Sequence, residues 1–76
     1  MIEVKFLARL KEEIGQDSME IAARDGMTIA DIKQQFFSDA QFQLPILQAL
    51  NHEFCDETTA VSDGDIVAFF PPVTGG

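Results

Sequence analysis

Hydrophobic and polar residues alternate from the start of the chain, and this period of two predicts a β-strand over Ile2–Ala8. The spacing becomes helical over Arg9–Ile14, where Gly15 provides a stop signal. Strand character returns over Ser18–Ala23. The first part of the chain is therefore predicted to contain two strands joined by a short helix.

The clearest helical signal begins at Thr28, which stands at capping-box spacing from Asp31. Met27 comes just before this cap and can pack on Ile32 as a hydrophobic staple. Three apolar residues recur at helical spacing along one face: Ile29, Ile32 and Phe36. We expect this face to lie on a sheet as part of the core.

The second half of the chain contains short predicted strands separated by turn signals. Strands are predicted over Ile46–Leu50 and Glu53–Cys55, with Asn51–His52 as the turn between them. Ser62–Asp65 is a further turn signal, and it precedes a last predicted strand over Ile66–Phe70. One main helix must then cover one sheet. This predicts an α+β β-grasp fold, in which the main helix packs across a mixed sheet and a short second helix is added.

Alternation divides the last predicted strand between two faces. Val67 and Phe69 point to one face and are predicted to be core, whereas Ile66, Ala68 and Phe70 share the other. We expect Phe70 to contribute to an exposed apolar patch that docks on a partner protein. The alternative, in which Phe70 is simply a core residue, stays open at this point.

The composition is that of a small folded protein. The chain has 76 residues, of which 46% are hydrophobic, and residues 1–70 are predicted to form one domain. A domain of this size buries only ~60% of the surface that its unfolded chain exposes, so the core is small. No apolar run approaches the ~20 residues of a membrane helix, and no signal peptide precedes the first strand. The single cysteine leaves no internal disulfide, which favours the reducing cytoplasm.

Charge narrows the range of partners. Thirteen acidic residues against five basic ones give a formal net charge of −8. Such a charge repels phosphate backbones and anionic lipid, so neither nucleic acid nor a membrane surface is an expected partner. It favours encounter with a basic protein surface. A role in solubility alone is an equally good interpretation of the same charge.

Few residue types for catalysis or metal binding are present. The chain contains one histidine and one cysteine, and it lacks the GxGxxG, P-loop, HExxH and CxxC motifs. A structural zinc site needs about four ligands, so no bound metal is expected. Acidic neighbours make Cys55 a poor thiolate, and we interpret it as a small hydrophobe in a strand. His52 is interpreted as a solvated residue of its turn.

Residues 71–76 follow the last strand directly and are predicted to form a flexible functional tail. Pro71 and Pro72 end the strand and stiffen an extended exit. The tail reaches about 20 Å, at roughly 3.3 Å per residue, which is enough to enter a pocket of another protein. Gly75 and Gly76 lack a Cβ and can thread a narrow channel. The unhindered terminal carboxyl suits activation as an acyl-adenylate and attack by a sulfur nucleophile. A frayed terminus without function is the alternative.

Several parts of the sequence together resemble one known family. Residues Asp63–Gly76 closely resemble the C-terminus of the small, sulfur carrier subunits of molybdopterin synthase, which are ubiquitin-like β-grasp proteins. Val4–Ala8, Leu10–Gly15 and Ala49–Asn51 fit the same family. The acidic segment Cys55–Ala60 departs from its pattern.

The resemblance implies a cycle of reactions at the C-terminus. An ATP-dependent adenylyltransferase, similar to ubiquitin-activating enzymes, adenylates Gly76, and a sulfur donor converts the adenylate to a thiocarboxylate. The tail then enters the large subunit of molybdopterin synthase, where the sulfur passes to cyclic pyranopterin monophosphate and builds the molybdopterin dithiolene. The large subunit supplies the catalytic side chains, in a heterotetramer. The chain itself binds no cofactor, because ATP is used by the activating enzyme.

The resemblance also implies roles for single residues. Gly76 carries the adenylate and the thiocarboxylate, and Phe70 belongs to the partner interface. Five residues insert into the pocket of the partner: Pro71, Pro72, Val73, Thr74 and Gly75. Three other functions stay open. They are a sulfur carrier for thiamin thiazole synthesis, a ubiquitin-like modifier of lysines, and an interaction module with an inert tail. The run Phe69–Pro72 argues against the first of these.

Overall fold

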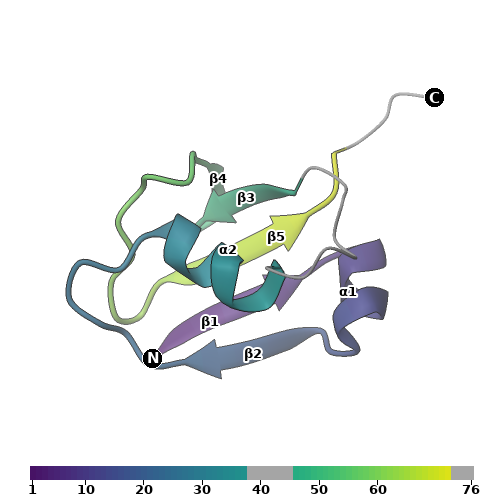
Figure 1. The fold of residues 1–76 in the computed structure, drawn as a ribbon, viewed down its shortest axis with the longest axis horizontal. Helices are drawn as coiled ribbons and strands as arrows, with labels where there is room; N and C mark the ends of the chain where they lie inside the picture. The colour runs from purple at the N-terminus through teal and green to yellow at the C-terminus, as the bar shows by residue number, and fades with distance from the viewer. Residues whose placement is uncertain (38–45, 73–76) are drawn as a thin grey trace.

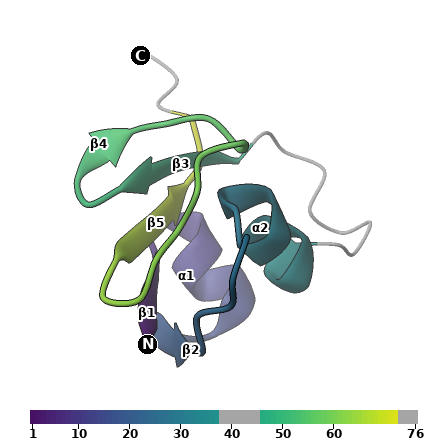
Figure 2. The same ribbon diagram turned by 90° about the vertical axis from the view of Figure 1, so that its left-hand side faces the viewer.

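A computed structural model describes residues 1–37 and 46–72 (Figure 1). These residues form one five-stranded sheet and two helices, in the order β1 (Ile2–Phe6), α1 (Arg9–Ile14), β2 (Ser18–Ile21), α2 (Ile29–Phe37), β3 (Leu47–Leu50), β4 (Glu53–Phe54) and β5 (Ile66–Phe70). The strand order across the sheet is β2-β1-β5-β3-β4. β1 and β5 pair in parallel and the other neighbours are antiparallel, so the sheet is mixed. α2 lies across one face, and the predicted α+β β-grasp fold is confirmed (Figures 1 and 2).

The start of α2 follows the predicted cap. The backbone N–H of Thr28 donates to Asp31 Oδ2 at 2.9 Å, and the Thr28 hydroxyl donates to the same oxygen at 3.2 Å. The helix begins one residue later, at Ile29. A side-chain acceptor at this position satisfies an N–H group that the helix itself leaves unpaired, and a carboxylate is also favoured by the helix dipole.

β1 is two residues shorter than predicted because of the backbone at Ala8. This alanine has a φ of 55°, in the left-handed region that a strand cannot include. The N–H of Leu10 donates to the carbonyl of Leu7 at 3.1 Å and closes a turn that leads into α1. Alanine gives no sequence signal for such a turn, and the prediction of a strand through Ala8 was wrong in this respect.

Other strand boundaries differ from the prediction because a strand ends where its partner ends. Ile21 pairs with Ile2, the first residue of β1, so the predicted extension to Ala23 has no partner strand. In the same way β3 begins at Leu47, which pairs with Phe70 at the end of β5. These limits follow from pairing between distant segments and not from the local pattern.

The core lies between the sheet and α2. Its buried residues are Ile2, Val4, Phe6, Leu10, Met27, Ile29, Ile32, Ile46, Val61, Val67 and Phe69. Val67 and Phe69 are fully buried, and Phe36 packs against the cluster, as predicted. The Phe37 ring also packs there, with its centroid 5.2 Å from that of Phe69 in an edge-to-face arrangement. The helical stripe had not indicated Phe37.

Lys33 connects α2 to the chain segments that precede β3 and follow β4. Its ammonium donates to the Ile46 carbonyl at 2.9 Å and to Glu57 Oε1 at 2.6 Å. The buried Gln48 side chain donates to the Cys55 carbonyl at 2.8 Å. Cys55 itself follows β4, rather than lying within it as predicted, and packs half-buried against the core. Its interpretation as a small hydrophobe is thereby confirmed.

Candidate functional site

The strand that carries the tail is held from both sides. β5 lies between β1 and β3, and beyond the ladder the N–H of Leu7 donates to the Phe69 carbonyl at 3.0 Å. At the other end of the strand, the Asn51 N–H donates to the Ile66 carbonyl at 2.7 Å, and the Ile66 N–H donates to Asn51 Oδ1 at 2.9 Å. A central strand fixed in this way gives the tail a rigid starting point.

The tail begins at the end of β5. Phe70 is the last strand residue, and the half-buried Pro71 and Pro72 follow it, as predicted. The other predicted tail residues, Val73–Gly76, lie outside the described residues. Since β1 and β5 run in parallel, the tail starts at the end of the sheet opposite to the N-terminus (Figure 1).

The two faces of the sheet differ in whether α2 covers them. Val67 and Phe69 of β5 face the core, and the alternating residues face the side that α2 does not cover (Figure 2). Register places three residues of β3 and β4 on that same side, because Leu47 is opposite Phe70 and Ala49 is opposite both Ala68 and Phe54. We call this surface the open apolar face; it consists of Leu47, Ala49, Phe54, Ile66, Ala68 and Phe70.

Phe54 and Phe70 form an aromatic pair on the open apolar face. Their ring centroids are 5.6 Å apart in an edge-to-face arrangement. Phe54 is 80% exposed, whereas Phe70 is half-buried. Phe70 therefore stands on the face opposite to the core, where the alternation had placed it. Phe54 was missed by the sequence analysis, because a two-residue strand gives no alternation from which its face can be inferred.

Charged residues border this surface on β1 and β2. Glu3 and Glu20 are directly opposite each other across the antiparallel pair, on the same side of the sheet as the open apolar face. Like charges in such a cross-strand pair destabilise the sheet locally. Within residues 1–37 and 46–72, neither carboxylate forms an ion pair. Lys5, which is opposite Ala68, lies on the same side, so the open side of the sheet combines an apolar half with a border of mixed charge.

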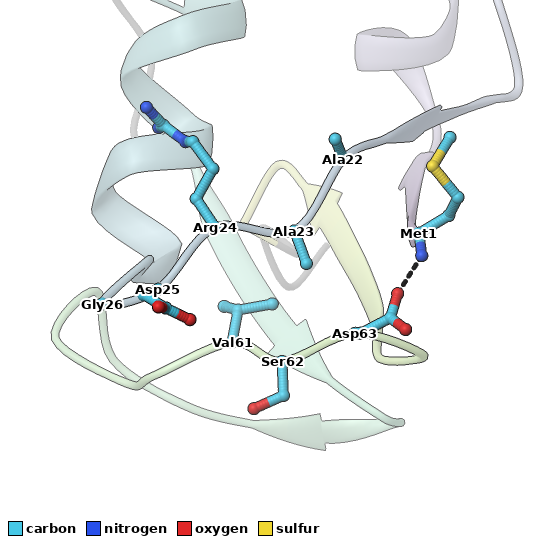
Figure 3. Close-up of a pocket in the computed structure, with 9 residues that line it drawn as sticks. All are labelled: Met1, Ala22, Ala23, Arg24, Asp25, Gly26, Val61, Ser62 and Asp63. Atoms are coloured by element: carbon cyan, nitrogen blue, oxygen red, sulfur yellow. Dashed lines mark hydrogen bonds and ion pairs between the residues drawn. The ribbon is translucent and has the colours of Figure 1, made fainter.

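A surface pocket lies at the other end of the molecule (Figure 3). Its lining consists of Met1, Ala22, Ala23, Arg24, Asp25, Gly26, Val61, Ser62 and Asp63. Figure 3 shows the Arg24 side chain directed away from the pocket, toward α2. The polar contact drawn across the pocket wall joins the N-terminal ammonium of Met1 to Asp63. This pocket offers no nucleophile paired with a base.

The ion pair with the N-terminus changes the acidity of Asp63. The hydrogen bond from the Met1 ammonium, followed by its positive charge, holds the pKa of Asp63 below its ordinary value of 3.8. A carboxyl whose pKa is lowered in the folded state adds stability above its unfolded pKa, and this contribution is lost as pH falls through the folded pKa. The pair is exposed, so its effect on stability is small.

Extension of the chain before Met1 tests this contact. Added residues move the ammonium away from Asp63, and we expect the Asp63 pKa to rise toward 3.8. A titration followed by NMR at the Asp63 carboxyl carbon, in the native and the extended chain, measures the difference. Identical titration midpoints in the two chains would contradict the contact.

In the part of the chain that the structure describes, histidine, cysteine, aspartate and glutamate do not gather into a group of three that could hold a metal ion. Neither α1 nor α2 has the length and apolar character that a membrane-crossing helix requires.

Comparison with known proteins agrees with the fold described above. Residues 4–76 match the ThiS family. The chain is 38% identical, over 82 aligned residues, to the molybdopterin synthase sulfur carrier subunit of Escherichia coli, and the alignment covers 100% of both chains.

Solved structures share the fold. A protein of Pyrococcus furiosus, assigned as molybdopterin converting factor subunit 1, superposes with a TM-score of 0.82 at 25% identity over 95% of this chain and 97% of that one. A chain of the complex between subunits 1 and 2 of the Helicobacter pylori molybdopterin-converting factor gives a TM-score of 0.65 at 28% identity, over 99% of this chain and 97% of that one. The resemblance inferred from the sequence is thus confirmed: the chain belongs to the ThiS family, and its relatives there are sulfur carrier subunits of molybdopterin synthase with a ubiquitin-like β-grasp fold.

Proposed function

We propose that this chain is the sulfur carrier subunit of a molybdopterin synthase. The observation that carries the proposal is the 38% identity to the molybdopterin synthase sulfur carrier subunit of Escherichia coli, in an alignment that covers 100% of both chains and so includes the terminal glycines. The fold supports it, because a rigid central strand leads directly into the tail.

The chemistry of the proposal takes place at the Gly76 carboxylate. An ATP-dependent adenylyltransferase joins this carboxylate to AMP and releases pyrophosphate. A sulfur donor then attacks the acyl carbon, AMP leaves, and a thiocarboxylate is formed. The thiocarboxylate sulfur is a good nucleophile. Two charged chains each pass one sulfur to cyclic pyranopterin monophosphate to build the molybdopterin dithiolene, and water attacks each acyl carbon and restores the Gly76 carboxylate.

The other catalytic tasks fall to the large subunit. Binding a pterin phosphate and stabilising a leaving group require basic groups in a shielded pocket. The carrier has only five basic residues and a formal net charge of −8. We therefore assign those groups to the large subunit, which receives Pro71–Gly76 and contacts Phe70 in a heterotetramer. The complex of subunits 1 and 2 in Helicobacter pylori supports such a pairing.

Intact-mass measurement tests the proposal. The purified chain is incubated with its adenylyltransferase, ATP and a sulfur donor, and we expect the mass increase that accompanies replacement of one oxygen by sulfur. Omission of ATP is the control. Addition of the large subunit and cyclic pyranopterin monophosphate should then restore the original mass and yield molybdopterin. If stable conjugates with protein lysines formed in place of the thiocarboxylate, the chain would be a protein modifier. If its mass did not change, the tail would be inert.

A further inference from the structure

One largely buried charged side chain has no part in the proposed chemistry. Lys33, on α2, is 22% exposed. Its ammonium donates to the Ile46 carbonyl at 2.9 Å, to Glu57 Oε1 at 2.6 Å and to Gln48 Oε1 at 3.4 Å. An ammonium has three N–H donors, so three acceptors satisfy it, and a buried charge is tolerated only when it is paired in this way. Lys33 therefore fixes α2, the start of β3 and the segment after β4 relative to one another.

The contacts of Lys33 lie where the ladder between β3 and β4 stops. The register that pairs Leu50 with Glu53 would place Ile46 opposite Glu57 if it continued. β4 has only two residues and ends before this point. A buried backbone carbonyl still needs a donor, and that of Ile46 receives one from the Lys33 ammonium, which also binds the Glu57 carboxylate. Lys33 thus takes the place of a backbone hydrogen bond at the unpaired start of β3.

The acidic segment Cys55–Ala60, which departs from the pattern of the family, supports this contact. The N–H of Ala30 donates to the Glu57 carbonyl at 2.9 Å, and the N–H of Ile29 donates to the Thr59 carbonyl at 3.0 Å. Both N–H groups belong to the first turn of α2, where a helix leaves its donors unpaired. The segment therefore caps α2 and presents the Glu57 carboxylate to the ammonium.

The start of β3 matters for the tail because it pairs with the end of β5. β3 begins at Leu47, which is opposite Phe70. In the same ladder the Asn51 N–H donates to the Ile66 carbonyl, and hydrogen-bonded pairs alternate, so Leu47 and Phe70 form a hydrogen-bonded pair. The two prolines that follow have no N–H to extend the ladder. We call Phe70–Pro72 the tail root; on this side its last backbone support is Leu47.

We propose that Lys33 is a positioning residue for sulfur transfer, which holds the start of β3 and, through the Leu47–Phe70 pair, fixes the tail root. This inference rests on the proposed function. Lys33 acts from the side of the sheet that α2 covers (Figure 2). A tail root that is already ordered loses less conformational freedom when the tail enters the large subunit. Once the tail is bound, the large subunit holds it, so the effect lies in KM and not in kcat.

Hydrogen exchange of the free chain, followed by NMR, tests the structural step. Lys33→Met keeps most of the aliphatic stem and removes every donor. We expect exchange at the Leu47 and Phe70 amides to become at least about tenfold faster relative to the Val4 amide of β1, because the loss of the contact opens this corner locally. Lys33→Arg keeps donors and should restore slow exchange. Equal acceleration at Val4 would show a general loss of stability and would overturn the proposal.

Steady-state sulfur transfer tests the functional step. Thiocarboxylated chains are mixed with the large subunit and cyclic pyranopterin monophosphate, and molybdopterin is measured. We expect Lys33→Met to raise the KM for the carrier by about three- to tenfold at unchanged kcat, and Lys33→Arg to recover most of this loss. Glu57→Ala removes the carboxylate that holds the ammonium and should raise KM less. It should add little to Lys33→Met in the double variant, because Glu57 acts through Lys33.

Met19→Ala is the matched control. It removes a half-buried side chain that packs on the core from β2, and β2 is separated from β3 by β1 and β5. It should lower stability without changing KM. The assignment is wrong, and the proposed function stands, if Lys33→Met leaves KM at its native value, lowers kcat alone, or raises KM no more than Met19→Ala. If the native thiocarboxylated chain transfers no sulfur, the proposed function fails, and exchange in the free chain still decides whether Lys33 fixes the tail root.

Discussion

Removal of Gly76 is expected to abolish sulfur transfer and to leave the fold intact. The carboxylate that is activated belongs to this residue, and a chain ending at Gly75 places its carboxylate one residue short, roughly 3.3 Å, of the reacting position. A displacement of this size removes most of the advantage of correct positioning. Thiocarboxylate formation is measured by intact mass, and molybdopterin formation is measured with the large subunit.

Two matched variants separate the causes of this loss. Amidation of the native terminus keeps the length and removes the carboxylate, so we expect no thiocarboxylate. Gly76→Ala keeps both length and carboxylate and adds only a Cβ, so we expect reduced activity. Urea denaturation should give the same midpoint for all of these chains, because the tail follows the sheet. An amidated chain that still supported molybdopterin synthesis would refute the mechanism.

Phe69→Ala is expected to lower the free energy of unfolding by about 3–5 kcal/mol, as for other buried phenylalanines. Phe69 is fully buried and contacts the Phe37 ring, so its removal leaves a cavity between the sheet and α2. In a domain of 76 residues this is a large part of the total stability. Urea denaturation followed by circular dichroism measures the change.

Phe70→Ala is the matched control for Phe69→Ala. It removes the same side chain from the neighbouring position of the same strand, but on the open apolar face. Because Phe70 is only half-buried, we expect a clearly smaller loss of stability. Equal losses for the two variants would show that Phe70 also belongs to the core, which is the alternative that alternation alone had left open.

Local chemistry made several elements predictable from the sequence. The spacing of Thr28 and Asp31 indicated the cap of α2, and both predicted hydrogen-bonding partners are found there. The turn at Asn51–His52 is present, with a positive φ at both residues. The alternation over Ile66–Phe70 separated the core side from the open side correctly. Each of these signals acts over a few residues, so the sequence displays it directly.

By itself, then, the sequence determined the elements, the two faces of the last strand and the tail as the candidate site. Only the tertiary structure decided that β5 lies between β1 and β3. It also decided that the Phe54 ring packs against the Phe70 ring, although the two residues are sixteen positions apart in the sequence. It also showed the left-handed turn at Ala8, which shortens β1. The physical reason is that strand order and register depend on pairing between distant segments, and such pairing leaves no local pattern in the chain.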